Sequence, residues 1–173
     1  MAQAFGRAGQ VSIIAGNNGV EVKGIYEFLR DASKADKRFD VESRIAAGKV
    51  AENLLVKARV EAGSVFRNRQ ALEVMKGMKV GKDRIPKVYL ARTSGFVSVS
   101  NPNRKRKRKV TRGDVFWGAE FGGGARPSTR QFLRHRGRSA YFFWPTVRKE
   151  KENIAREYLD AIQKVLNTLK NSA

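Results

Sequence analysis

The chain has 173 residues and no cysteine, and its 36 Lys and Arg against 16 Asp and Glu give a formal net charge of +20 at pH 7. The lack of cysteine excludes disulfides, thiolate metal sites and a cysteine nucleophile, and no apolar run approaches the ~20 residues that span a bilayer. A charge of this size must meet a negative partner or stay well solvated. We therefore expect a protein made in the cytoplasm, with no membrane partner, that binds nucleic acid or an acidic protein surface.

The N-terminal half predicts an arm followed by helices. Residues 1–19 are expected to form a flexible arm, in which residues 11–15 either pair with residues 20–22 around Asn18-Gly19 as a hairpin or stay a disordered leader. Apolar residues at three- and four-residue steps predict helices over residues 25–35, 36–62 and 68–78, with Asp36 as the N-cap of the second helix.

The second half predicts strands and one long helix. Strand-forming residues at 87–92 and 96–100 are expected to pair as a hairpin through Thr93-Ser94-Gly95, with further strands at 114–121 and 140–144. A helix over residues 146–170 follows, with Pro145 in its first turn; its apolar stripe packs on the sheet or, alternatively, forms a coiled coil. Residues 20–173 are thus predicted to form a single α+β domain, a small antiparallel sheet packed by two or three N-terminal helices and one long C-terminal helix.

The sequence offers no set of residues for catalysis or for a metal or other cofactor. The only histidine, His135, lies between Arg134 and Arg136, and these neighbouring cations disfavour its protonated form. One histidine without cysteine provides no transition-metal ligand set. Spacing alone allows a Ser-His-Asp group, but nothing in the sequence marks a nucleophile turn. We therefore expect no enzyme and no cofactor.

The positive charge is concentrated in two loops, at residues 101–113 and 122–138. Arginine suits bidentate contacts with phosphates and with carboxylates alike, so these side chains could hold nucleic acid or an acidic partner; the unbroken basic run could also be a solvated loop that repels itself. The candidate contact residues are Arg104, Lys105, Arg106, Lys107, Arg108, Lys109, Arg112, Arg126, Arg130, Arg134, Arg136 and Arg138.

Glu120 is the only acid between Asp114 and Glu150, and it stands among aromatic residues. A carboxylate is costly to bury without a partner, so Glu120 is expected to pair with Arg148 or Arg126, within the chain or across a subunit boundary; otherwise it is an exposed strand residue. Exposed aromatic anchors are typical of interfaces, and stacking on single-stranded bases is their alternative use. The candidate interface residues are Trp117, Glu120, Phe121, Phe142, Trp144 and Arg148.

The order of these motifs also carries a family resemblance. Glu120-Phe121-Gly122 closes an aromatic segment, Phe142-Phe143-Trp144-Pro145 follows, and a long helix comes after both. With the short entry at residues 20–25 and the helices after it, this order resembles the small tail-component family of long-tailed bacteriophages, the tail-completion or head–tail joining proteins. The resemblance extends over roughly residues 20–170.

The resemblance implies a structural virion protein that acts by docking and has no chemical step. It would form a ring, most often sixfold, between the head connector and the tail terminator, after synthesis in the host bacterial cytoplasm. Its partners would be copies of itself, the neighbouring head-connector and tail-terminator or tail-tube rings, and the packaged genomic DNA. The alternatives are a tail terminator of the same neck region and a free basic nucleic-acid-binding protein.

Overall fold

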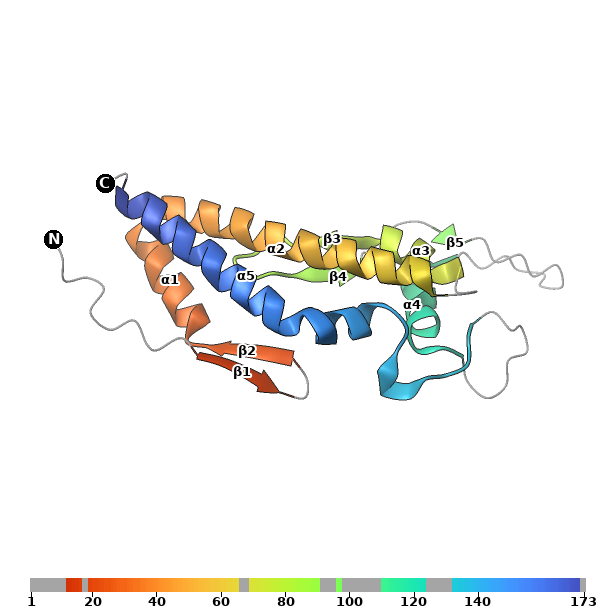
Figure 1. Ribbon diagram of the computed structural model, residues 1–173. Coiled ribbons are helices and arrows are strands. Elements are labelled where there is room, and N and C mark those ends of the chain that lie inside the picture. The colour runs from red at the N-terminus through yellow and green to blue at the C-terminus, as the bar shows by residue number, and fades with distance from the viewer. Residues whose placement is uncertain are drawn as a thin grey trace. The chain divides into compact units, whose positions relative to one another are not determined.

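The protein has an α+β fold with a long C-terminal helix (Figure 1). The structure is a computed structural model that describes residues 12–16, 19–65, 69–90, 96–97, 110–123 and 132–171. Where the sequence suggested one domain over residues 20–173, the chain divides into two compact units. Unit 1 consists of Met1–Glu52, Gly81–Lys87 and Glu150–Ala173, and unit 2 of Asn53–Val80 and Val88–Lys149.

Unit 1 begins with a β-hairpin followed by helices. Strands β1 (Ser12–Gly16) and β2 (Gly19–Lys23) pair antiparallel with Gly16 opposite Gly19. Of the two interpretations offered for this segment the hairpin is therefore confirmed, and β1 lies inside the stretch expected to be a flexible arm. Residues 1–11 lie outside the described residues.

Three helices supply the core of unit 1. They are α1 (Ile25–Ala35), α2 (Lys37–Ser64) up to Glu52, and α5 (Phe143–Asn171) from Glu150 onwards. The stripe of α5 packs against the other two helices, whereas we expected it to pack on a sheet. The buried cluster consists of Ile25, Leu29, Ala32, Phe39, Ala47, Val50, Tyr158 and Ile162.

Asp36 separates α1 from α2 and caps the second helix, as predicted. Its carboxylate accepts the backbone N–H of Arg38 at 2.8 Å, which satisfies one of the N–H groups that a helix start leaves without a partner. The same carboxylate pairs with the Arg38 guanidinium at 3.0 Å. These side-chain and backbone hydrogen bonds from Arg38 lower the pKa of Asp36.

Unit 2 contains the rest of α2, two short helices and short strands. In chain order these are α3 (Arg69–Lys76), β3 (Met78–Val80), β4 (Val88–Leu90), β5 (Phe96–Val97), β6 (Val110–Thr111), α4 (Arg112–Phe121), the 3₁₀ turn η1 (Gly137–Ser139) and the start of α5. Its core joins α2, α3 and α4 with the residue before α5, and comprises Leu55, Ala58, Ala62, Ala71, Val74, Met75, Met78, Val115, Phe116, Ala119 and Phe142.

The predicted four-stranded sheet is wrong in its pairing. Strand β4 pairs with β3, and β5 pairs with β6, so the described strands form three separate two-stranded antiparallel ladders. The helix expected to extend to Met78 ends at Lys76, where the Gly77 N–H turns back to the Val74 carbonyl at 2.9 Å. The residues after this turn form β3, which pairs with β4. Strand β4 was expected to pair with β5.

Residues 114–121 form helix α4, and the prediction of a strand there is wrong. Thr111 and Asp114 form a capping box: the Thr111 hydroxyl accepts the Asp114 N–H at 3.3 Å, and the Asp114 carboxylate accepts the Thr111 N–H at 2.9 Å. Reciprocal capping satisfies two donors at a helix start. It therefore outweighs the strand propensity of the aromatic residues that follow.

Residues 140–144 are not a strand either. Ala140 has a left-handed φ of 59°, which breaks any extended run, and α5 already begins at Phe143. Pro145 stands in the first turn of that helix, as predicted, where its missing N–H costs no hydrogen bond.

Candidate functional site

Glu120 connects the two segments that bear most of the candidate interface residues. Its side chain is fully buried at the C-terminal end of α4, and its carboxylate accepts the backbone N–H groups of Phe143 at 3.0 Å and of Trp144 at 2.8 Å. Those N–H groups belong to the first turn of α5 and have no partner inside the helix. The carboxylate also places negative charge where the helix dipole favours it.

Glu120 is a buried helix residue, so the alternative of an exposed strand glutamate is wrong. Among the described residues its hydrogen bonds come from the backbone and not from an arginine side chain. Burial raises the pKa of Glu120, and this effect is opposed by the backbone hydrogen bonds and, least of all, by the charge of Arg148. Arg126, the other arginine considered, lies outside the described residues.

Arg148 fastens the turn before α5. Its guanidinium donates hydrogen bonds to the carbonyls of Arg138 at 2.9 Å and of Ser139 at 2.6 Å. The arginine therefore holds η1, and with it the exposed Arg138 side chain, against the first turns of α5.

Five side chains form what we call the arginine–aromatic corner: Trp117, Phe121, Arg134, Arg136 and Tyr141. Trp117 is 62% exposed and stacks on Phe121, with ring centroids 5.6 Å apart. The Phe121 carbonyl accepts the Arg136 N–H at 2.9 Å. The Arg136 guanidinium lies over the Tyr141 ring, 4.9 Å from its centroid, a cation–π contact.

The corner is held close to α4 by two glycines. A Cβ at Gly118 would lie 2.5 Å from the Phe132 ring, so only glycine lets that ring pack on the helix. Gly122 has a φ of 87°, and a Cβ there would come within 2.4 Å of the Arg134 carbonyl. The segment that carries Arg134 and Arg136 is therefore in direct contact with the end of α4.

The other predicted site residues have different surroundings. Trp144 is partly exposed and meets Phe143 edge-on. Phe142 is fully buried in the core of unit 2, so it presents no surface to a partner. The Arg112 side chain is mostly buried and lies 3.9 Å from the Glu73 carboxylate. The predicted contact residues that lie outside the described part of the chain are Arg104, Lys105, Arg106, Lys107, Arg108, Lys109, Arg126 and Arg130.

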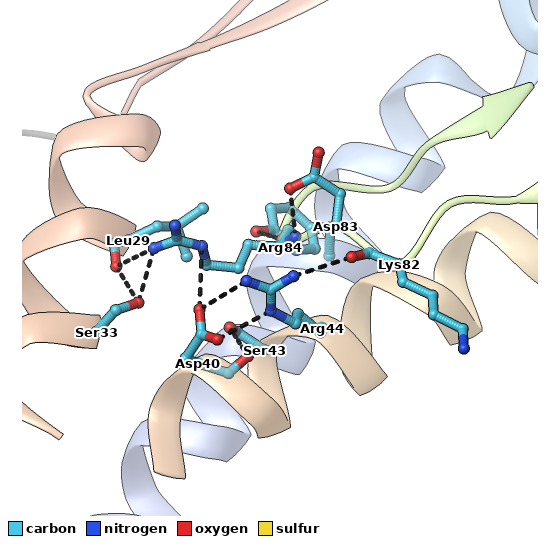
Figure 2. Close-up of polar contacts among 9 residues, drawn as sticks. Leu29, Ser33, Asp40, Ser43, Arg44, Lys82, Asp83 and Arg84 are labelled. Atoms are coloured by element: carbon cyan, nitrogen blue, oxygen red, sulfur yellow. Dashed lines mark hydrogen bonds and ion pairs between the residues drawn. The ribbon is translucent and has the colours of Figure 1, made fainter. Parts of the chain in front are cut away.

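Unit 1 contains a second polar centre, around Arg84, that no sequence motif predicted (Figure 2). The Arg84 guanidinium donates to the Leu29 carbonyl at 3.3 Å and to the Ser33 hydroxyl at 2.9 Å, and its Nε lies 3.2 Å from the Asp40 carboxylate. Asp40 also pairs with Arg44 at 2.9 Å. One arginine of the segment Gly81–Lys87 is thereby tied to both α1 and α2.

Helix α5 closes this centre through Tyr158. The buried Tyr158 hydroxyl donates to the Arg84 carbonyl. Burial is the main cause that raises the pKa of Tyr158 well above its ordinary value, so the phenol stays neutral and keeps its donor proton. No sequence signal links Ser33, Asp40, Arg84 and Tyr158, because the contacts join residues far apart in the chain.

The described part of the chain contains no gathering of three or more histidine and carboxylate side chains that could hold a metal ion. Within the same residues, no helix combines the length and the apolar character needed to cross a bilayer.

Comparison of the chain with protein-family models, with curated proteins and with solved structures found no match.

Proposed function

We propose that the protein is a structural assembly protein that docks through the arginine–aromatic corner onto an acidic partner. The observation that carries this proposal is the side-chain array at the corner: an exposed Trp117 stacked on Phe121, beside an exposed Arg136 stacked on Tyr141. Exposed tryptophan and arginine are the residue types that dominate binding hot spots. Stacked arginine is also more weakly hydrated than lysine, so its burial in an interface costs less.

The charge around the corner favours an acidic partner. The described residues 115–123 and 132–149 contain one acid, Glu120, and it is buried and hydrogen-bonded. Arg134, Arg136 and Arg138 are exposed in the same region. An incoming carboxylate or phosphate would therefore meet guanidinium groups. Asp114, the exposed acid one helical turn before Trp117, already has its carboxylate hydrogen-bonded to Thr111.

The setting we propose is the neck of a long-tailed phage, where the protein would be the tail-completion or head-to-tail joining ring subunit of the virion. The two segments that carry the resemblance to that family, Glu120–Gly122 and Phe142–Pro145, are joined by the hydrogen bonds from Phe143 and Trp144 to Glu120. This contact supports the proposal because it explains structurally why the two motifs occur together in one chain. Neighbouring rings and packaged DNA are the partners, and a tail terminator is the related alternative.

A stop codon early in the gene, introduced in the phage that carries it, tests the setting. Electron microscopy of the lysate should show full heads beside separate tails of normal length. Overlong tails would assign the protein to tail termination, whereas intact infectious particles would contradict a structural role in the virion.

The docking surface is tested by complementing that mutant with corner variants. Trp117→Ala with Arg136→Gln should fail to restore joined particles, since both change the exposed array. Tyr26→Ala with Lys164→Gln is a matched control on unit 1, because it also removes one exposed aromatic side chain and one cation. Equal complementation by both pairs would overturn the assignment of the corner.

Free nucleic-acid binding is a second candidate because the net charge is +20. Titration of the purified protein against random duplex DNA at two salt concentrations separates the candidates. Tight binding that persists at physiological salt favours the free binder, whereas weak binding that salt abolishes is expected of a protein that assembles on an acidic ring.

A further inference from the structure

A second basic feature lies in unit 1 and is independent of the arginine–aromatic corner. It is a shallow hollow of about 550 Å³ between α1, α2 and the segment Gly81–Lys87. Its lining residues are Arg30, Ser33, Lys34, Lys37, Asp40, Val41 and Arg84. We call it the Arg84 hollow.

Positive charge exceeds negative charge around the hollow. Four cations line it, and Asp40 is the only acid in the lining. The Asp40 carboxylate is already shared between Arg84 at 3.2 Å and Arg44 at 2.9 Å. Arg30 pairs with Asp31 at the surface, while Lys34 and Lys37 form no ion pair with any described residue.

The guanidinium of Arg84 is held in a fixed position at the hollow. Its Nη1 donates to the Leu29 carbonyl and the Ser33 hydroxyl, and its Nε pairs with Asp40 (Figure 2). The other terminal nitrogen, Nη2, has no hydrogen-bond partner among the described residues. Its donors are therefore available to a ligand, and the ordering of the side chain has already taken place in the free protein.

We propose that the Arg84 hollow binds a phosphate group. Lys34 and Lys37 supply flexible ammonium groups beside the fixed guanidinium, so several donors surround one small volume. A free phosphate group presents more acceptor oxygens than the two of a carboxylate, and its charge offsets part of the excess lining charge. The phosphate could come from a free phosphorylated molecule or from a nucleic-acid backbone, since both present negatively charged phosphate oxygens.

The test is an NMR titration of the full chain at constant ionic strength. Inorganic phosphate replaces chloride, and the signals followed are the Arg84 Nε–Hε and the Ser33 backbone amide. Saturable shifts of both signals are expected. Shifts that grow linearly without saturation would mean that the hollow attracts anions without binding them at a site, and would overturn the proposal.

Lys34→Gln with Lys37→Gln is the variant pair to compare, because both side chains are exposed and form no ion pair with a described residue. It should weaken phosphate binding by roughly tenfold, as expected when charge-assisted hydrogen bonds are lost. Lys49→Gln with Lys164→Gln removes the same charge from exposed helix positions outside the hollow and should leave the affinity within about twofold. Equal weakening by both pairs would show a general charge effect and would contradict a site.

Two further ligands identify the source of the phosphate. A short single-stranded oligothymidylate that shifts the same two signals and competes with phosphate supports a nucleic-acid backbone as the ligand. An oligonucleotide that leaves them unchanged while phosphate saturates them supports a free phosphorylated molecule. A poly-glutamate peptide that shifts them where phosphate does not would overturn the proposal in favour of a carboxylate partner.

Discussion

Glu120 and Trp144 are joined by a hydrogen bond of 2.8 Å from the Trp144 backbone N–H to a Glu120 carboxylate oxygen, across 24 positions of sequence. A second bond, from the Phe143 N–H, reaches the other oxygen. The acid therefore caps a helix to which it does not belong, and it ties the end of α4 to the start of α5. Trp117 and Trp144, which are exposed, lie on the two segments that this buried contact joins.

Glu120→Ala should lower the free energy of unfolding by roughly 2–4 kcal/mol at neutral pH, because it leaves two partly buried N–H groups without their partner and opens a cavity. Urea denaturation followed by tryptophan fluorescence measures the change. Glu152→Ala, at an exposed position of α5, is the control and should stay within about 0.5 kcal/mol of the unchanged protein. A similar loss in both variants would contradict the capping role.

Glu120→Gln should change how stability depends on pH. Because burial raises the pKa of Glu120 above the ordinary value of 4.5, the folded state holds this proton more tightly than the unfolded state does. The group therefore contributes stability that is present at acid pH and is lost as the pH rises through the folded-state pKa.

Urea denaturation of the unchanged protein and of Glu120→Gln at several pH values between 4 and 7.5 measures this effect. The stability advantage of the unchanged protein over the variant should shrink as the pH rises through that range. An advantage that grows with pH would mean that the hydrogen bonds from α5 outweigh burial and that the pKa is lowered.

Gly118→Ala and Gly48→Ala should have opposite effects. A methyl group at Gly118 would press against the Phe132 ring at 2.5 Å, whereas at Gly48 it meets nothing within 4 Å. The first substitution should destabilise by roughly 1–3 kcal/mol through overpacking. The second should stabilise helix α2 by about 0.5–1 kcal/mol, and thermal unfolding of both variants gives the comparison.

Tyr158→Phe should destabilise the protein by roughly 1–3 kcal/mol, because it removes the donor to the Arg84 carbonyl and leaves that acceptor without its partner. Tyr26→Phe is the matched control, since Tyr26 is 74% exposed. Chemical denaturation of both variants separates the two cases. An unchanged midpoint for Tyr158→Phe would mean that the hydroxyl contributes nothing to the Arg84 centre.

Local signals in the sequence predicted the helices near Ile25 and Asp36 and offered the hairpin around Asn18-Gly19 as one of two alternatives. Their causes are local: apolar spacing, an acidic N-cap and a dipeptide that tolerates a tight turn. The strand expected at 114–121 was wrong because aromatic content was weighed above the Thr111–Asp114 capping box, which was readable in the sequence. The start of α5 at Phe143 could not be read, because its cap is Glu120, far away in the chain.

The candidate site shows the same contrast between local sequence signals and contacts made only by folding. Charge and aromatic content drew attention to Trp117, Arg134 and Arg136, which are exposed on the structure, but they could not show that Phe142 is buried in the core. The Arg84 centre left no local signature, since Arg84 is a single arginine in a loop. Its importance comes from partners on α1, α2 and α5 that only the folded chain brings together.

The division of unit 1 into three separate stretches of sequence has a consequence for synthesis on the ribosome. The core of this unit needs Tyr158 and Ile162 from α5, which leave the ribosome long after α1 and most of α2. At ordinary translation rates the delay is on the order of ten seconds. During that interval Leu29, Phe39 and Val50 have no partner from α5. Unit 1 must therefore complete its folding after α5 has emerged, and a nascent chain halted before α5 should be a substrate for chaperones and proteases.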